Sequence, residues 1–406
     1  MREFSRKAGC LLKLIAKLIA GIVAGILLGL TQIDWIVRLA VTVKDLFGGF
    51  IHFIVPFIIL LFIASGISKL GKESGKLLGA TVGTAYVSTL LAGILAFFVA
   101  SFIMPLVVST GTVPEEGEGI KGFLDLEIEP VMGVLTALIC AFVFGIGMTR
   151  VKSDTLMKAF DEGREIIELT IAKVVLPILP FYIAGIFAEL AAAGTVFQTL
   201  KVFGIVLIVA VLLHWVWLLV LYTLAGLYNR RNPFVLLKNM LPAFFTAIGT
   251  MSSAATIPVT LRQAKANQVS DEIANFSIPL CATIHLSGST ITITSCSVAV
   301  MALLNEGGIP GFFEMLPFIL MLGVIMVAAP GVPGGAVMAA AGILASMLGF
   351  NEEAIGLMIA LYMAQDSFGT ATNVTGDGAI ALLLDKYMSS KKAEGWSVSY
   401  QSADTE

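Results

Sequence analysis

The sequence predicts an all-α polytopic membrane protein with eight transmembrane helices and two re-entrant helical hairpins that enter from opposite sides. Of its 406 residues, 57% are hydrophobic and only 13% are charged, whereas roughly a quarter of the residues of a soluble domain are charged. Several charge-free runs, such as 46–68, 77–114 and 202–229, reach the length of about 20 residues that a membrane-spanning helix needs. No segment has the polar composition of a separate soluble domain.

The basic residues set the expected orientation. The amino terminus is basic and then apolar, but its apolar run is long and lacks a convincing small-residue cleavage site, so we expect a first membrane helix rather than a signal peptide. With both termini in the cytoplasm of a multi-pass plasma-membrane protein, the basic clusters fall on the cytoplasmic side at each return. The clusters are Arg2, Arg6 and Lys7; Lys69, Lys72 and Lys76; Arg150, Lys152, Lys158 and Arg164; Arg230, Arg231 and Lys238; and Lys386, Lys391 and Lys392, with Arg38, Lys44 and Lys121 as exceptions.

Two apolar segments do not fit a simple crossing. Residues 239–261 run between basic ends, and their middle, GTMSSAATIP, is rich in small and hydroxylated residues. This composition favours a re-entrant hairpin whose tip is buried in protein or faces a water-filled cavity. After a crossing at about 272–303, residues 312–350 repeat the pattern from the other face with APGVPGGA, and a last helix covers about 353–385. Each of these two Gly-, Pro- and Ser-rich stretches, taken alone, would also fit a kinked transmembrane helix.

The last helix carries the candidate functional residues. Asp366, Thr370, Asn373 and Asp377 follow at i, i+4, i+7 and i+11, so they share one face of the helix. An Asp at the centre of a membrane helix costs about 2.5–3.5 kcal/mol on insertion scales, which indicates that it is retained for binding. The sequence therefore predicts a polar stripe that lines a cation-coupled substrate site.

Other functional classes fit less well. The two carboxylates are separated by roughly 16 Å along the helix, whereas the shared-proton dyad of an intramembrane aspartyl protease requires contact. No repeated filter residues indicate a pore, and nucleotide-binding and hydrolase motifs are absent from the sequence. We expect a protein that is not an enzyme and that has no nucleic-acid partner.

Four motifs resemble, in order, those of the dicarboxylate/amino acid:cation symporters, the family of the glutamate transporters. They are SSAATIP at 252–258, PLCATIHLSGST at 279–290, GVPGG at 331–335 and NVTGD at 373–377. They resemble the first hairpin tip, the unwound centre of the seventh helix, the second hairpin tip and the eighth-helix motif. The resemblance is specific over about 230–386, and the chain is closest in character to the sodium:serine/threonine branch.

This resemblance implies a homotrimer with an elevator mechanism, in which a transport domain moves against a fixed scaffold. The scaffold would comprise residues 1–76 with helices 1–2 and residues 107–194 with helices 4–5. The transport domain would comprise helix 3 at 77–106 and residues 195–388, which hold helix 6, hairpin 1, helix 7, hairpin 2 and helix 8. A cytoplasmic tail would cover 389–406, and the polar composition of its stretch WSVSYQSADTE at 396–406 predicts disorder there.

The resemblance also implies a substrate site. Asp366 would bind a substrate ammonium and Asn373 its carboxylate, while backbone groups at Ser253 and Val332 close the pocket. Ser289 and Thr370 would contribute hydroxyl contacts. The full implied set is Ser252, Ser253, Ser289, Val332, Ala336, Asp366, Gly369, Thr370 and Asn373.

Sodium is the implied coupling ion. Asp377, with carbonyls around Cys281, His285 and Asn373, would hold one sodium ion. Carbonyls at Met326, Val327 and Ala329, near Thr283, would hold a second. The family triplet Asn-Met-Asp is replaced by His285-Leu286-Ser287, which leaves only the hydroxyls of Ser88, Thr89 and Ser287 at a third site. We therefore expect one or two sodium ions per cycle, with proton coupling through His285 as the alternative.

Two departures from the family pattern bear on the substrate. Gly369 stands where acidic-substrate members place an arginine, and Met251 stands where an alternative arginine would precede the serine tip. Without a guanidinium, a second substrate carboxylate would be buried without a partner. A small neutral amino acid, with serine, threonine and alanine first, is favoured over the acidic amino acids and dicarboxylates that remain the alternative.

The segment DEGREIIE at 161–168 is expected to be a solvated helix end.

Overall fold

The computed structural model describes residues 2–72, 76–107, 120–124, 128–151, 154–304, 308–329 and 333–393. Within these ranges every regular element is helical, as predicted. The helices are α1 (Arg2–Leu30), α2 (Asp34–Lys72), α3 (Lys76–Val107), α4 (Val134–Val151), α5 (Asp154–Thr170), α6 (Leu176–Ala192), α7 (Val196–Asn229), α8 (Pro233–Thr250), α9 (Ser253–Ala266), α10 (Asp271–Ile284), α11 (Ser287–Leu304), α12 (Phe312–Met326), α13 (Gly335–Leu348) and α14 (Glu352–Ala393). A π-helical turn over Ile171–Val175 connects α5 to α6.

Length and composition allow several of these helices to cross a membrane. Six spans in the described residues are long and apolar enough: α2, α3, the joined α5 and α6, α7, α8, and the joined α10 and α11. Shorter apolar helices lie at 16–30, 136–151, 312–326 and 335–348. The predicted count of eight crossings and two re-entrant hairpins stays a prediction. Of the predicted tail at 389–406, residues 389–393 belong to α14, and the rest lies outside the described residues.

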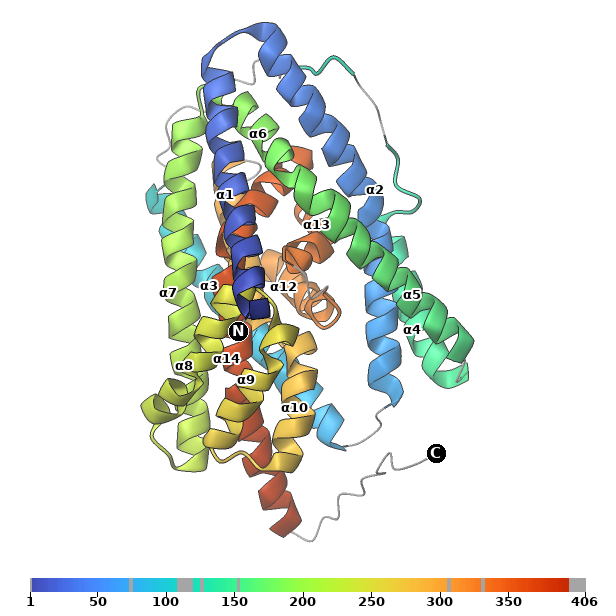
Figure 1. Cartoon of the computed structure of the whole chain (residues 1–406), viewed down its shortest axis with the longest axis vertical. Coiled ribbons are helices and arrows are strands. Elements are labelled where there is room, and N and C mark those ends of the chain that lie inside the picture. The colour runs from blue at the N-terminus through green and yellow to red at the C-terminus, as the bar shows by residue number, and fades with distance from the viewer. Residues whose placement is uncertain are drawn as a thin grey trace.

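The helices pack in two groups (Figure 1). In one group, α2 packs against α4, α5 and α6, and α1 packs along α6. In the other, α14 contacts α7, α8, α9, α10 and α11, while α3 packs on α11. Contacts of α13 with α2 and α4, and of α14 with α6, join the groups. That one group moves against the other remains a prediction.

Three glycines allow α1 to lie directly on the backbone of α6. Gly21, Gly25 and Gly29 are spaced by four residues, so they form one stripe along α1. A Cβ atom at these positions would stand only 2.2–2.3 Å from the carbonyl oxygens of Pro180, Ala184 and Ala188. Such stripes of small residues let helix backbones approach closely in membranes.

Replacing Gly25 by Leu should therefore separate α1 from α6. Overpacking costs roughly 1–3 kcal/mol and sometimes more, so we expect the thermal midpoint of the detergent-solubilised protein to fall. The matched control is Gly83→Leu, because a Cβ on that α3 glycine meets nothing within 4 Å. Equal melting of the two variants would contradict the proposed role of the α1–α6 contact.

The predicted hairpin tips coincide with helix breaks. Helix α8 ends at Met251, whose φ of 45° is left-handed, and the Ser252 hydroxyl caps α9 by accepting from the Ala255 N–H at 3.3 Å. Helix α9 then packs back against α8. In the second pair, α12 ends at Met326 and α13 begins after Gly334, whose φ is 74°.

A third break interrupts the predicted crossing at 272–303. Helix α10 ends at Ile284, and α11 begins at Ser287. Between them His285 leaves the helical region, with φ −107° and ψ 87°. This break falls inside the segment 279–290 that was expected to be unwound, and it exposes backbone groups beside α14.

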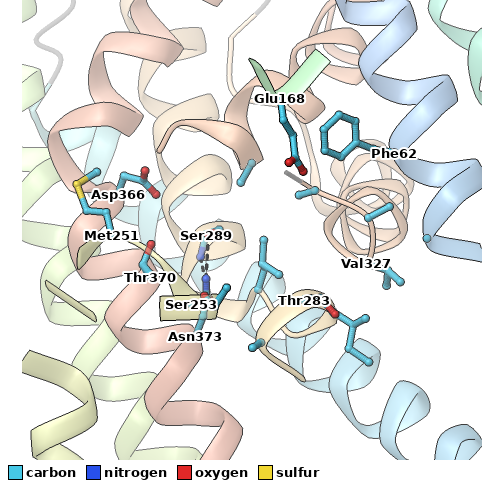
Figure 2. A pocket seen from close by; sticks show the side chains of 18 of the residues that line it. Phe62, Glu168, Met251, Ser253, Thr283, Ser289, Val327, Asp366, Thr370 and Asn373 are labelled. Carbon is cyan, nitrogen blue, oxygen red and sulfur yellow. Dashed lines mark hydrogen bonds between the residues drawn. The ribbon is translucent and has the colours of Figure 1, made fainter. Parts of the chain in front are cut away.

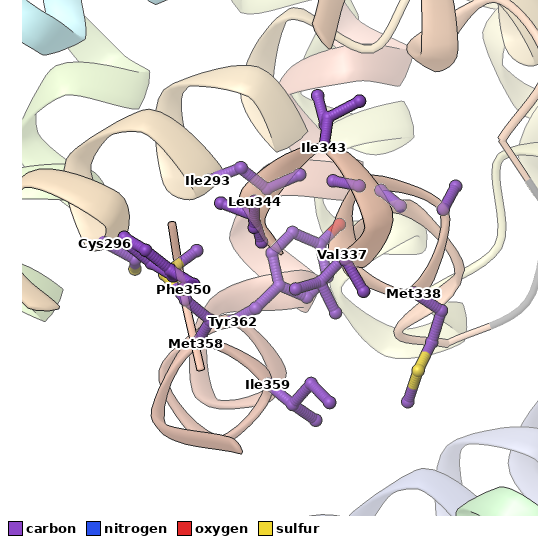
Figure 3. Packing of buried hydrophobic residues seen from close by; sticks show 14 of the residues in the cluster. Ile293, Cys296, Val337, Met338, Ile343, Leu344, Phe350, Met358, Ile359 and Tyr362 are labelled. Atoms are coloured by element: carbon purple, nitrogen blue, oxygen red, sulfur yellow. The ribbon is translucent and has the colours of Figure 1, made fainter. Parts of the chain in front are cut away.

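Buried apolar side chains of α11, α13 and α14 pack next to these helix breaks. Residues Val337 and Leu344 of α13 pack with Tyr362 of α14 and Ile293 of α11 (Figure 3). Every one of these four side chains is at most 1% exposed. Helix α14, which extends beyond the predicted end at 385, therefore carries its polar stripe through a close-packed interior.

Candidate functional site

A cavity of about 500 Å³ lies between the helix breaks and the α2–α5 side of the molecule (Figure 2). Its volume falls within the roughly 300–1,000 Å³ of small-molecule sites. It is lined by Phe62, Gly66, Arg164, Glu168, Met251, Ser253, Ala254, Leu280, Ala282, Thr283, Ile284, Leu286, Ser289, Val327, Ala328, Ala329, Ala336, Tyr362, Asp366, Thr370 and Asn373. The cavity thus touches both hairpin-like helix pairs, the α10–α11 break and α14.

Asp366 is the carboxylate of the cavity wall formed by α14. Its side chain is 4% exposed, and Oδ2 accepts a hydrogen bond from the Gly334 N–H at 2.8 Å. The hydroxyls of Tyr362 and Thr370 lie beside the same carboxylate. Gly334 directly precedes α13, so the α12–α13 pair contacts this side chain through its backbone. The described residues give Asp366 no ion-pair partner, and the carboxylate faces the cavity.

Asn373 and Ser289 form the polar centre of the same wall. The Asn373 Oδ1 accepts from the backbone N–H groups of Gly288 at 2.7 Å and Ser289 at 3.3 Å. Its Nδ2 donates to the Ser289 hydroxyl at 3.0 Å, and Tyr362 donates to that hydroxyl at 3.1 Å. A hydroxyl that accepts two bonds retains its own proton for donation. Ser289 is therefore oriented as a donor beside the cavity.

The other predicted substrate residues lie in different places. Ser253, Ala336 and Thr370 line the cavity, but Ser252 does not, because its hydroxyl caps α9. Gly369 faces α11, where a Cβ would meet the backbone of Gly288 and Ser289 at 3.5 Å. Val332 lies outside the described residues.

A second polar cluster surrounds Asp377, deeper in the protein. The His285 Nδ1 lies 2.9 Å from Asp377 Oδ1, and its Nε2 lies 2.8 Å from the Ser88 hydroxyl. Both members of the His285–Asp377 pair are at most 1% exposed. A neutral imidazole with its proton on Nδ1 satisfies both contacts, because it donates to the carboxylate and accepts from Ser88. The sequence singled out the His285 carbonyl and its titration, not this side-chain pair.

Asp377 Oδ2 is buried and has no hydrogen-bond partner among the described residues. The hydroxyls of Thr89 on α3, Ser287 on α11 and Thr375 on α14 are likewise buried without a partner there. A buried polar atom left unpaired costs about 1–3 kcal/mol, so the unpaired Oδ2 of Asp377 is suited to a hard cation, which prefers oxygen ligands. Among the described residues no group of three His, Cys, Asp or Glu side chains forms a metal site. Any cation here would depend on Asp377, hydroxyls and carbonyls.

The remaining predicted ion ligands divide between core and cavity. The Cys281 carbonyl accepts the His285 N–H at 2.9 Å, within the last turn of α10. Thr283, Val327 and Ala329 line the main cavity, whereas Met326 is fully buried. The Thr283 hydroxyl donates to the Leu280 carbonyl at 2.8 Å. The structure therefore brings three of the four residues of the predicted second ion set to the cavity wall.

Arg164 and Glu168 are cavity residues that the sequence did not reveal. They belong to the segment expected to be a solvated helix end, but they line the cavity with Phe62. Their four-residue spacing predicts a pair on one helix face. Nothing in the sequence places that face of α5 opposite α14.

The membrane-length helices, the broken helix pairs and the buried carboxylate beside a cavity define a polytopic membrane transporter rather than an enzyme. The family model of the sodium:dicarboxylate symporter family matches residues 14–387, and the chain belongs to this family.

Similar proteins include, by name, both excitatory and neutral amino acid transporters. The excitatory amino acid transporter 1 of Mus musculus is 30% identical over 259 residues, which are 63% of this chain and 46% of that protein. The neutral amino acid transporter B(0) of Macaca fascicularis is 28% identical over 279 residues, 67% of this chain and 50% of that protein. The chain thus matches about half the length of these curated relatives.

Proposed function

We propose that this protein is a secondary active symporter that imports a small neutral amino acid, such as serine, threonine or alanine, with sodium. It would work as a homotrimer by an elevator motion in the plasma membrane, with both termini in the cytoplasm. The observation that carries the proposal is the wall formed by α9–α14. There a single carboxylate, Asp366, faces the cavity beside the neutral donors Ser289, Asn373 and Thr370.

This arrangement suits an amino acid zwitterion. The substrate ammonium would bind Asp366, and the carboxylate would bind the Ser289 hydroxyl and the remaining amide proton of Asn373. Hydrogen bonds to charged groups are stronger than neutral ones, so one fixed anion and a few oriented donors give both affinity and orientation. Thr370, one turn from Asp366 on the same cavity wall, would contact a substrate hydroxyl.

The charges around the cavity disfavour a second substrate carboxylate. The charged side chains among its described lining residues are Asp366, Arg164 and Glu168. The only guanidinium among them belongs to Arg164, which donates to Glu168 at 3.1 Å. Met251 lines the cavity without contributing charge, and Gly369 contributes no side chain. An acidic substrate would therefore bury one carboxylate without a partner, at a cost of several kcal/mol.

Sodium is the proposed coupling ion because the buried Asp377 carboxylate keeps one oxygen, Oδ2, without a hydrogen-bond partner among the described residues, and a hard cation prefers oxygen ligands. The pairing of Asp377 with His285 makes the proton the second candidate, since a histidine can change its charge near neutral pH.

Uptake of radiolabelled L-serine into proteoliposomes tests the proposal. We expect accumulation driven by an inward sodium gradient at equal pH on both sides, with competition by threonine and alanine but not by aspartate or glutamate. Uptake that needs only a pH gradient would contradict sodium coupling. Equal competition by aspartate would contradict the neutral substrate.

A further inference from the structure

The α5 side of the cavity carries a pair of opposite charges that the proposed substrate site does not use. The Arg164 Nε donates to Glu168 Oε1 at 3.1 Å, and the two side chains are 33% and 28% exposed. The Arg164 guanidinium also stacks over the Phe62 ring, 5.4 Å from its centroid. Figure 2 shows Glu168 and Phe62 across the cavity from Asp366.

The backbone that presents this pair is held against α2. The Ser65 hydroxyl donates to Asp161 one turn before Arg164. A Cβ on Gly163 would stand 3.0 Å from Leu61, so α5 lies close on α2 at this point. Arg164 and Glu168 therefore start from a fixed surface, and only their side chains need to move for their charged ends to reorient.

Helix stabilisation alone is a weak explanation of the pair. An i, i+4 ion pair that water reaches adds little stability, and a charged residue on the wall of a substrate path in a membrane protein is a candidate functional group. The cavity also extends past Asp366 and Asn373 as far as Arg164 and Glu168, so a small amino acid at the α14 wall would leave the α5 wall accessible.

We propose that Arg164, Glu168 and Phe62 form a second, weaker binding site for an α-amino acid zwitterion. The ligand class rests on the proposed function. The carboxylate of the ligand binds the guanidinium of Arg164, whose planar fork matches carboxylate geometry, and the ammonium binds Glu168. A simple anion would face Glu168 and a simple cation would face Arg164, so the pair selects a ligand that carries both charges.

The affinity of this site is low because the ligand must displace the internal pair. A low affinity suits a site that receives substrate released from Asp366 and passes it on.

Binding of L-serine to purified Asp366→Asn protein isolates the second site, because this variant lacks the proposed central ammonium site. We expect a weak saturable binding phase in saturation-transfer NMR, and roughly tenfold or greater loss of it on adding Arg164→Gln with Glu168→Gln. This double change keeps the net charge. Ethanolamine and glycolate, which carry one charge each, should not compete with serine for this phase.

Lys158→Gln with Glu162→Gln is the matched control in the same background. Both residues lie exposed on α5 at the same spacing and do not line the cavity. Equal weak binding in the two multiple variants, or no weak phase in Asp366→Asn itself, would overturn the second site. Wild-type protein that binds no serine would instead overturn the proposed function and, with it, the ligand assigned here.

Discussion

Replacing Asp366 by Asn is expected to abolish high-affinity amino acid binding and with it sodium-driven uptake. The substrate ammonium would lose its charged partner in a buried site, which typically costs 2–5 kcal/mol, or roughly 30-fold to 4,000-fold in affinity. The asparagine Oδ1 still accepts from the Gly334 N–H, so the contact of the helix pair with α14 is retained. The measurement is a thermal-shift titration with serine, because a ligand stabilises the folded protein by mass action.

The matched control for this change lies on the same helix. Asp385→Asn removes the same charge from α14, where Oδ1 accepts from the Ser270 N–H at 3.2 Å and its hydroxyl at 2.6 Å, at an exposed end. We expect wild-type serine affinity for this variant. Serine binding of wild-type affinity in Asp366→Asn would show that the ammonium binds elsewhere.

Local sequence patterns were enough to locate the helix breaks. A serine-rich stretch with a proline predicted the turn at Met251 and Ser252, because such residues favour caps over helix interiors. The glycine- and proline-rich segment predicted the end of α12 in the same way. The helical spacing from Asp366 to Asp377 predicted a shared polar face, since that periodicity depends only on the helix itself.

Contacts between distant segments were not predictable from one sequence. His285 and Asp377 are 92 residues apart, and the histidine reaches the carboxylate because Gly376 leaves room for its ring: a Cβ there would stand 2.8 Å from the His285 Cε1. Arg164 was assigned to solvent because the charge pattern of α5 is that of an exposed helix. Only the packing of α5 on α2 and the position of α14 bring it to the cavity.

Replacing Asp377 by Asn is expected to weaken sodium binding by about tenfold or more, equivalent to about 1.4 kcal/mol or more. The change removes the formal negative charge of the buried carboxylate, and the amide that replaces Oδ2 would present hydrogen atoms to the cation. Because an asparagine oxygen can still accept from His285 Nδ1, the fold around the site should persist. The measurement is the sodium dependence of thermal stability, with choline chloride at equal ionic strength as the control salt.

The two carboxylate variants should then separate the two ligands. Asp366→Asn should keep the sodium-induced rise in thermal midpoint and lose the serine-induced rise. The direct effect of Asp377→Asn should instead be a loss of sodium affinity. If sodium and serine bind cooperatively, thermodynamic linkage requires that each raises the affinity of the other by the same factor. Serine binding to Asp377→Asn should therefore be weak at low sodium and recover as sodium saturates the weakened site. An Asp377→Asn protein with unchanged sodium dependence would place the coupling ion elsewhere, and the hydroxyl and carbonyl groups around Thr283 and Ala329 would be the next site to test.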